Sequence, residues 1–179
     1  MPISSEIQLT LLTGEISATS LSYIAGLFDG EGWIRTQVRP RGKGKRHGLI
    51  LQIGISNTNK EVLNWIQSII GGRVKEVNNK RQTPCFQWEV TDRQSIKVII
   101  ASLYPYLRIK QNRAKLLLTL LNKIRGDGAG TTIIGGVRRK ASYPIEYWEE
   151  LKKIADAIYM QNTKRGYETY KSGPLFTRE

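Results

Sequence analysis

The sequence predicts an α+β domain in which an antiparallel sheet carries helices on one of its faces. Helical and strand-like periodicities follow each other in the order helix, two strands, helix, two strands, then helices. In the strands, apolar residues alternate with basic and amide residues, so one face of the sheet is apolar and the other polar. A chain of 179 residues is long enough for one such domain with a hydrophobic core.

The individual elements follow from apolar spacing and from glycines that end helices. Leu21, Ile24 and Phe28 recur at helical spacing in the first helix, and Gly71 ends the second as glycine commonly does. The predicted elements are a helix at 17–28, strands at 33–39 and 49–56, a helix at 59–70, strands at 73–77 and 85–91, and helices at 93–103, 111–124 and 144–160.

Composition shifts predict the limits of the domain. We expect an N-terminal extension at 1–16, the folded domain at 17–162 and a basic tail at 163–179. Segment 126–136 holds five glycines in eleven residues and is predicted to be a flexible loop. It is not a phosphate-binding P-loop, because no Gly-Lys-Ser/Thr closes it.

Charge indicates a polyanionic partner. The chain carries 28 Lys and Arg against 15 Asp and Glu, a net charge of +13. Nucleic acid is the expected partner, because cations that neutralise phosphates release condensed counterions. A ribosomal or chromatin-like protein without catalytic chemistry has the same composition and stays an alternative at this point.

The compartment and some site classes follow from what the sequence lacks. No apolar run approaches the ~20 residues that span a bilayer, so no membrane association is expected. Cys85 is the only cysteine, which excludes an intrachain disulfide, and His47 is the only histidine, which excludes a multi-histidine zinc site and an HNH-type nuclease. We expect a soluble intracellular protein of the cytoplasm, nucleoid or an organelle.

The polar face of the predicted sheet suits DNA. Arg35, Gln37 and Arg39 share one face of their strand, and six cations without an acid lie between residues 35 and 46. Such a run is often only a solvated surface, but here it covers a strand and the hairpin tip beyond it. Arg and Gln make bidentate contacts to guanine and adenine in the major groove. The candidate DNA contacts are Arg35, Gln37, Arg39, Arg41, Lys43, Lys45, Arg46, His47, Gln52, Arg73, Lys75 and Gln87.

Segment 23–32 contains small residues suited to close helix packing, followed by two acidic residues. Ala25 and Gly26 are small residues in an apolar helix, and Asp29 and Glu31 follow in a predicted turn where glycines flank Glu31. A helical Gly26 costs about 1 kcal/mol relative to alanine, which close approach of an identical helix would explain. Two such helices side by side bring two copies of Glu31 together. Paired carboxylates near phosphates suit a hard divalent cation such as Mg²⁺.

The stretch from Ile24 to Gly32 resembles the signature motif of the LAGLIDADG homing endonucleases. The resemblance implies the αββαββα fold of this family, with a saddle-shaped DNA-binding sheet. It also implies that Glu31 is the metal ligand, that Gly30 offers its carbonyl to the metal, and that Asp29 is mainly structural. Family members with one motif are homodimers, so Ala25, Gly26 and Asp29 are expected at a dimer interface and the DNA target is expected to be nearly palindromic.

Two further segments extend the resemblance. The stretch Leu107-Arg108-Ile109-Lys110-Gln111 is similar to a Leu-Lys-Leu-Lys-Gln stretch of single-motif members, whose catalytic lysine matches Lys110. Phosphate anchoring is the alternative role. Asn57, after the second strand, matches the residue that supplies a polar group to the active-site water, although the spacing leaves this assignment open by one position. The aromatic residues Trp65, Trp88, Trp148 and Phe86 lie at core-like positions and are expected to pack there, with stacking on bases as the alternative.

The resemblance implies an enzyme that cuts both DNA strands across the minor groove with Mg²⁺, or Mn²⁺ as a substitute. The products would carry 5′-phosphates and 3′-hydroxyls on 3′ overhangs, and the gene would lie in an intron. Two alternatives share the fold, namely an RNA maturase that binds its host intron RNA and a DNA-binding regulator that does not cut.

Overall fold

The computed structural model describes residues 16–40, 47–77, 84–124, 131–134, 137–140 and 143–161. The elements are α2 (Ala18–Glu31), β1 (Gly32–Pro40), β2 (His47–Asn57), α3 (Lys60–Ile70), β3 (Arg73–Val77), β4 (Cys85–Val90), α4 (Arg93–Leu103), the 3-10 helix η1 (Tyr104–Tyr106), α5 (Gln111–Lys123), β5 (Thr131–Ile134), β6 (Val137–Lys140) and α6 (Ile145–Met160). The predicted α+β class and the order of elements from α2 to α4 are confirmed.

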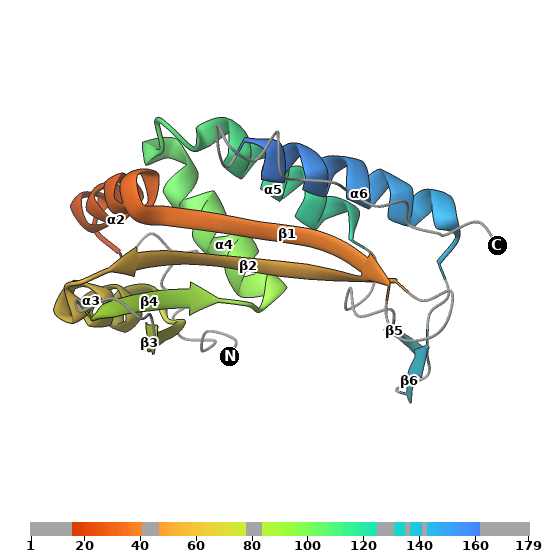
Figure 1. Cartoon of the computed structure of the whole chain (residues 1–179), viewed down its shortest axis with the longest axis horizontal. Coiled ribbons are helices and arrows are strands. Elements are labelled where there is room, and N and C mark those ends of the chain that lie inside the picture. Colours follow the sequence, from red (N-terminus) through yellow and green to blue (C-terminus); the bar gives the residue numbers. More distant parts are fainter. Residues whose placement is uncertain are drawn as a thin grey trace.

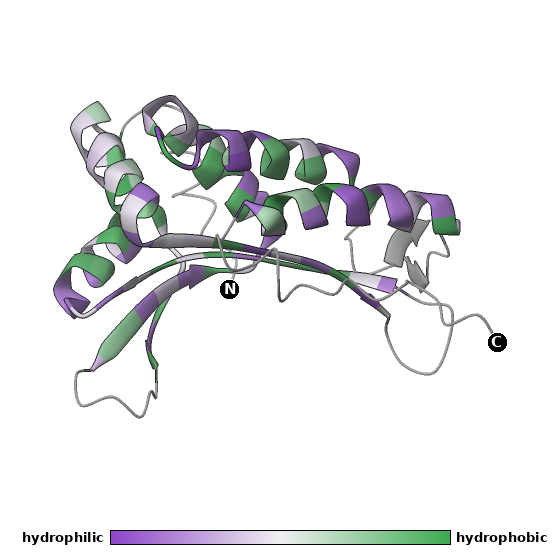
Figure 2. Ribbon diagram, turned by 45° about the horizontal axis from the view of Figure 1, so that its top comes forward, coloured by the Kyte–Doolittle hydropathy of each residue, from purple (hydrophilic) through white to green (hydrophobic). Residues whose placement is uncertain are grey.

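The main sheet is antiparallel throughout, with the strand order β1-β2-β4-β3. Its register pairs Ile34 with Ile53 across the β1–β2 hairpin and Glu89 with both Gly54 and Arg73. The helices lie on one side of this sheet, which is curved so that the uncovered face is concave (Figures 1 and 2).

Strand β1 shows how the two faces arise. Ile34 and Val38 are buried with Thr36 between them, whereas Arg35 and Arg39 are exposed. The predicted alternation is therefore confirmed. The buried Thr36 hydroxyl donates to the carbonyl of Ala155 at 3.0 Å, which joins β1 to α6 across the covered face.

Side-chain caps set the starts of α3 and α4. The Asn59 side chain accepts from the backbone N–H groups of Glu61 and Val62, and the Asp92 carboxylate accepts from Ser95 N–H at 2.8 Å. Each cap satisfies donors that a helix leaves unpaired in its first turn.

The aromatic residues divide between core and surface. Trp88 and Trp148 are buried as predicted, and the Trp88 indole donates to the carbonyl of Gly71 at 2.7 Å. The prediction for Trp65 is wrong, because this side chain is 37% exposed. Its ring contacts Tyr23 of α2 edge-on, with 5.4 Å between the ring centroids, so the two aromatics form an outer pair.

The segment expected to be a loop contains strands. Thr131–Ile134 pairs with Val137–Lys140 as the two-stranded sheet β5–β6, so the loop prediction for 126–136 is wrong over the described part. The missed signal is the β-branched run Thr-Thr-Ile-Ile followed by Gly-Gly, a sequence pattern that favours a hairpin. Over the described residues, none of the helices is both long and apolar enough to span a membrane.

Candidate active site and nucleic-acid interface

Helix α2 carries the motif to its end. The sequence predicted Asp29 and Glu31 in a turn after the helix. In the structure the helix continues through Glu31, so both acids lie in its last turn. Asp29 is buried at 7% exposure, whereas Gly30 and Glu31 are exposed. Because each helical residue is rotated by about 100° from the one before it, Asp29 and Glu31, two residues apart, point to nearly opposite sides of α2.

Asp29 anchors the segment that precedes α5. Its carboxylate accepts from three consecutive backbone N–H groups, those of Arg108 at 2.6 Å, Ile109 at 3.1 Å and Lys110 at 2.8 Å. The Lys110 ammonium donates back to the main-chain carbonyl of Asp29. The ends of α2 and α5 are therefore joined from both sides, across about 80 residues of chain.

Lys110 is a desolvated cation next to the motif acids. It forms the N-cap of α5 and is 9% exposed. Burial lowers the pKa of its ammonium, as does the charge of Arg113, while the carboxylates of Asp29 and Glu31 raise it. The Lys110 ammonium is thus held at the main chain of Asp29, two residues before Glu31, so the two most specific sequence predictions fall in one region of the fold.

Arg113 is a further cation of this region to which sequence reasoning gave no role. It lies one helical turn after Lys110 on α5, and its guanidinium donates to the carbonyl of Gln161 at the end of α6. Burial lowers the pKa of Arg113. The signal was available, because residues three apart on a helix share a face and both residues belong to the same basic stretch.

Asn57 has a local structural contact. It is half-buried at the end of β2, and its side-chain oxygen accepts from the N–H of Asn59 at 2.8 Å. This turn leads the chain directly into α3. The predicted role of Asn57, to supply a polar group to the active-site water, therefore stays a prediction.

The donor set for a divalent metal is small within one protomer. The described residues contain no group of three or more His, Cys, Asp and Glu that could hold a metal. Glu31 offers an exposed carboxylate, and Gly30, the exposed residue before it, offers a main-chain carbonyl. These are hard oxygen donors, which suit Mg²⁺, but among the described residues they do not complete a coordination shell.

The exposed side of α2 differs in part from the predicted dimer interface. Gly26 is exposed, and no atom lies within 4 Å of a Cβ added there, so another helix can approach closely. Ala25 and Asp29 are buried at 0% and 7% exposure within the protomer. Their assignment to the interface is wrong, because the helix turns them toward the core and toward the segment before α5.

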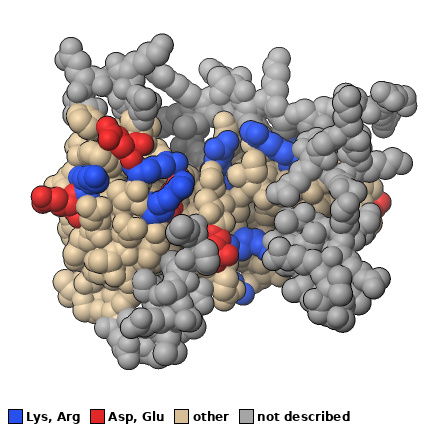
Figure 3. Space-filling view, turned by 90° about the horizontal axis from the view of Figure 1, so that it is seen from below, with Lys and Arg blue, Asp and Glu red and all other residues tan. Residues whose placement is uncertain are grey.

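The uncovered face of the sheet carries the predicted polar residues. Arg35 and Arg39 are exposed, and the Arg35 guanidinium lies 3.5 Å from the side-chain oxygen of half-buried Gln52. The Gln87 amide donates to the Ser56 hydroxyl at 3.1 Å. Lys and Arg side chains are visible at several places on the described part of the molecule when it is seen from this side (Figure 3). Gln37 is half-buried and Arg73 and Lys75 are exposed on the same face.

Glu89 pairs with the cations of β3. Its carboxylate is 5% exposed, forms an ion pair with Arg73, and lies 2.6 Å from the Lys75 ammonium. Burial raises the pKa of the Glu89 carboxyl, but the hydrogen bonds and charges of Lys75 and Arg73 outweigh this and make the pKa lower than usual. The sequence placed Glu89 on this face without indicating that it binds two of the predicted DNA contacts.

His47 lies elsewhere than predicted. It belongs to β2, pairs with Pro40 of β1 and is 4% exposed, with its ring 5.7 Å from that of Trp148 on α6. A side chain covered by α6 is not on the open face, so His47 is not a DNA contact in this structure. The predicted contacts Arg41, Lys43, Lys45 and Arg46 lie outside the described residues.

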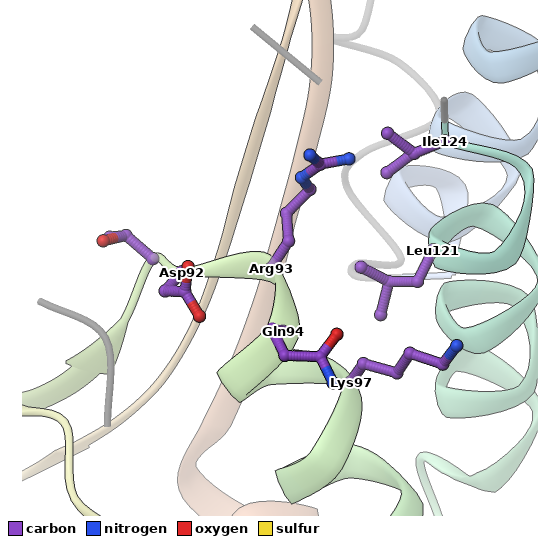
Figure 4. A pocket seen from close by; sticks show the side chains of 7 residues that line it. Asp92, Arg93, Gln94, Lys97, Leu121 and Ile124 are labelled. Atoms are coloured by element: carbon purple, nitrogen blue, oxygen red, sulfur yellow. The ribbon is translucent and has the colours of Figure 1, made fainter. Parts of the chain in front are cut away.

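A cavity of about 420 Å³ lies between the start of α4 and the end of α5. Arg93 and Lys97 of α4 extend toward Leu121 of α5 and Ile124, the residue that follows α5, in this cavity (Figure 4). Neither Glu31 nor Lys110 lines it. It is therefore separate from the candidate active site.

Solved structures of similar fold are homing endonucleases. One is I-CvuI in complex with the I-CreI target in the presence of Mg, with 21% identity, coverage of 87% of this chain and 86% of that chain, and a TM-score of 0.63. I-CvuI in complex with its own target in the presence of Ca has 21% identity, coverage of 90% and 88%, and a TM-score of 0.62. The archaeal intron-encoded homing endonuclease I-Vdi141I, complexed with DNA, has 17% identity, coverage of 88% and 90%, and a TM-score of 0.64. At these identities the likeness shows the fold.

The curated proteins contain no match to this chain. The sequence profile of the LAGLIDADG endonuclease family matches residues 24–119, which include the α2 motif, both hairpins of the main sheet and Lys110. This match spans more than half of the 179 residues. The chain belongs to the LAGLIDADG endonuclease family.

Proposed function

We propose that this protein is a site-specific homing endonuclease that cleaves both strands of a long, nearly palindromic DNA site. It acts as a homodimer of single-motif chains, cuts across the minor groove and leaves 3′ overhangs, and its gene is carried by an intron. The observation that carries the proposal is the junction of α2 and α5, where Lys110 lies beside the two motif acids. The solved relatives I-CvuI and I-Vdi141I, complexed with DNA, support the choice of partner.

The exposed end of α2 is the proposed metal site. Glu31 and the Gly30 carbonyl would hold Mg²⁺, or Mn²⁺ in its place, together with the partner copy's equivalent carboxylate and DNA phosphate oxygens. When bound, the metal supplies an activated water and stabilises the leaving oxygen. Asp29 takes no part as a ligand, since its carboxylate is occupied by three N–H groups.

Lys110 is the proposed electrostatic catalyst. Its ammonium is held against the Asp29 carbonyl at the end of α2, so its position is set before DNA binds. A cation in a largely desolvated site stabilises the negative charge that develops on the phosphate during attack. Asn57, at the end of β2, is the proposed group that orients the attacking water.

Exposed apolar side chains support the homodimer. Within the described residues, three large hydrophobic side chains are exposed, namely Tyr23 at 55%, Trp65 at 37% and Ile109 at 77%. Tyr23 lies on α2, Trp65 packs against Tyr23, and the Ile109 N–H is bound by Asp29 of α2. All three therefore adjoin the helix whose Gly26 side is open. A second copy packed along α2 would cover this apolar surface.

The concave face of the sheet is the proposed DNA-binding surface. The proposed contact residues within the described part of the chain are Arg35, Gln37, Arg39, Gln52, Arg73, Lys75 and Gln87. These residues would present guanidinium, ammonium and amide groups to base edges in the major groove. An antiparallel sheet curved in this way follows the curved surface of a duplex.

The proposal is tested by cleavage of a randomised library of palindromic duplexes. Wild type and Glu31→Gln are compared, first with Mg²⁺ and then with Ca²⁺, and cut molecules are identified by sequencing their ends. We expect Mg²⁺-dependent cuts at one long, nearly symmetric site, and we expect Glu31→Gln to retain binding while losing cleavage. Selective binding without cleavage under any metal would instead indicate a regulator or a maturase.

A further inference from the structure

Glu89 places a buried carboxylate on the open face of the sheet. It pairs across strands with Gly54 of β2 and Arg73 of β3, and its side chain is only 5% exposed. A carboxylate on a surface that meets phosphates opposes binding by charge repulsion, and its burial has a desolvation cost. Neither effect is expected on a surface that serves only for general attraction to DNA.

Each carboxylate oxygen of Glu89 holds one cation. Oε1 is paired with the Arg73 guanidinium, and Oε2 lies 2.6 Å from the Lys75 ammonium. The cations themselves remain accessible, with side-chain exposures of 57% for Arg73 and 41% for Lys75. Two charged ends are thus held in place while they still face a ligand, and the guanidinium keeps further N–H donors for it.

The neighbouring row of the sheet limits the space around Glu89. A Cβ added at Gly54 would lie 2.4 Å from Cζ2 of Trp33, so the Trp33 indole covers Gly54, the residue that pairs with Glu89. The low pKa of the Glu89 carboxyl means that it is ionised at neutral pH. The charge that holds Arg73 and Lys75 is therefore present under the conditions in which DNA is bound.

We propose that Glu89 is a specificity-determining positioning residue, which directs Arg73 and Lys75 to base edges and away from phosphates. The inference rests on the proposed DNA-binding function of this face. Side chains that are ordered before binding lose less entropy when they contact a base. The nearby carboxylate disfavours a phosphate at the same place, whereas a guanine edge, which is neutral, is still accepted.

Two substitutions separate positioning from charge. Glu89→Gln removes the charge, and Glu89→Asp keeps it but shortens the side chain so that both cations cannot be reached together. Glu76→Gln is the matched control, because Glu76 is an exposed acid directly after Lys75 in sequence, and its side chain alternates to the other face of β3. Circular dichroism melts establish that each variant is folded.

Binding is measured by selecting a randomised duplex library in Ca²⁺ and sequencing the bound fraction, and by the salt dependence of affinity for one random-sequence duplex. We expect both Glu89 variants to lose about tenfold of the base preference at the positions facing β3, the range expected for one bidentate contact. Glu89→Gln should also bind random DNA more tightly, with a salt slope steeper by about 0.9 for each phosphate newly contacted. Glu76→Gln should keep the wild-type base preference.

The outcomes are distinguishable. If wild type selects a sequence and both folded Glu89 variants select it equally well, Glu89 is structural and the inference is wrong, while the proposed function stands. If only Glu89→Gln loses preference and Glu89→Asp keeps it, charge and not positioning is responsible, and the inference is again wrong. If wild type selects no sequence at all, the proposed function fails and the inference fails with it.

Discussion

Asp29 shows how one side chain builds the candidate site. Its three accepted N–H groups fix the backbone of residues 108–110, and with it the position of the Lys110 ammonium. Hydrogen bonds to a charged acceptor contribute about 1.5–3 kcal/mol each, so the carboxylate is a strong determinant of this junction. We expect Asp29 to act through Lys110, since its own carboxylate is buried and bound by three N–H groups.

Asp29→Asn tests this role. Asparagine offers one acceptor oxygen and places an N–H₂ group against N–H donors, so we expect the folded protein to lose about 1.5–3 kcal/mol of unfolding free energy. We also expect the single-turnover cleavage rate to fall at least about tenfold, because a displacement of a catalytic group costs rate even without loss of binding.

Asp92→Asn is the control for Asp29→Asn. Asp92 caps α4 with hydrogen bonds to Ser95 and lines the cavity that is separate from the candidate site. Its substitution should reduce stability without reducing the cleavage rate of the folded protein. Equal rates for the two folded variants would show that Asp29 serves stability alone.

At the scale of elements, the two sides of α2 have different surroundings. Ile24, Ala25 and Phe28 are fully buried in the protomer, whereas the Gly26 side faces open space. Glycine lowers helix stability, and none of the described atoms of the protomer comes close enough to require it here. The proposed partner helix supplies the reason.

Gly26→Leu tests this explanation. Leucine favours the helix by roughly 0.8–1 kcal/mol over glycine and has open space at its Cβ in the protomer, so the variant should fold. Its side chain would keep two α2 helices apart, and we expect sedimentation velocity to show a monomer where wild type is a dimer. Ala101→Leu places a leucine at an exposed position of α4 and should remain dimeric. A dimeric Gly26→Leu protein would rule out close α2 packing.

The ranges of the helices and strands were predicted more accurately than the contacts that their side chains make with other elements. The ranges of α3, β3, β4 and α4 follow from apolar spacing and glycines, and they agree with the structure to within a residue. Trp65 and His47 were assigned to the wrong surroundings, because spacing along one element does not reveal which other element packs on it. Helix α6 covers His47, and Tyr23 is the ring that Trp65 meets.

For the whole molecule, the net charge of +13 favours a general attraction to polyanions such as DNA, and the proposed DNA-binding face of the sheet would orient it. The helices cover one face of the sheet and leave the concave face open (Figures 1 and 2). The exposed cations of β1 and β3 share that open face, at the two edges of the sheet. Charge of this kind gives affinity that depends steeply on salt.

Arg39→Gln tests where that charge acts. Titration of a fluorescent duplex at several KCl concentrations should give a linear decrease of log K with log salt, and the slope should become shallower by about 0.9 for each phosphate that the variant no longer neutralises. Lys153→Gln removes the same charge at an exposed position of α6, on the helical side, and should leave the slope almost unchanged. If both variants change the salt slope equally, the net charge of the protein attracts DNA without a defined binding face.

The sequence by itself determined the class of the fold, the two faces of the sheet, the small-residue helix and the acidic and basic residues that identify the family. These are properties of local periodicity and short motifs, which neighbouring residues encode. The tertiary structure alone decided that Asp29 binds the backbone about 80 residues away, that Lys110 is desolvated beside the motif acids, and that Glu89 holds Arg73 and Lys75. Such contacts depend on how whole elements pack and pair, and no local pattern specifies the partner that a side chain meets across the fold.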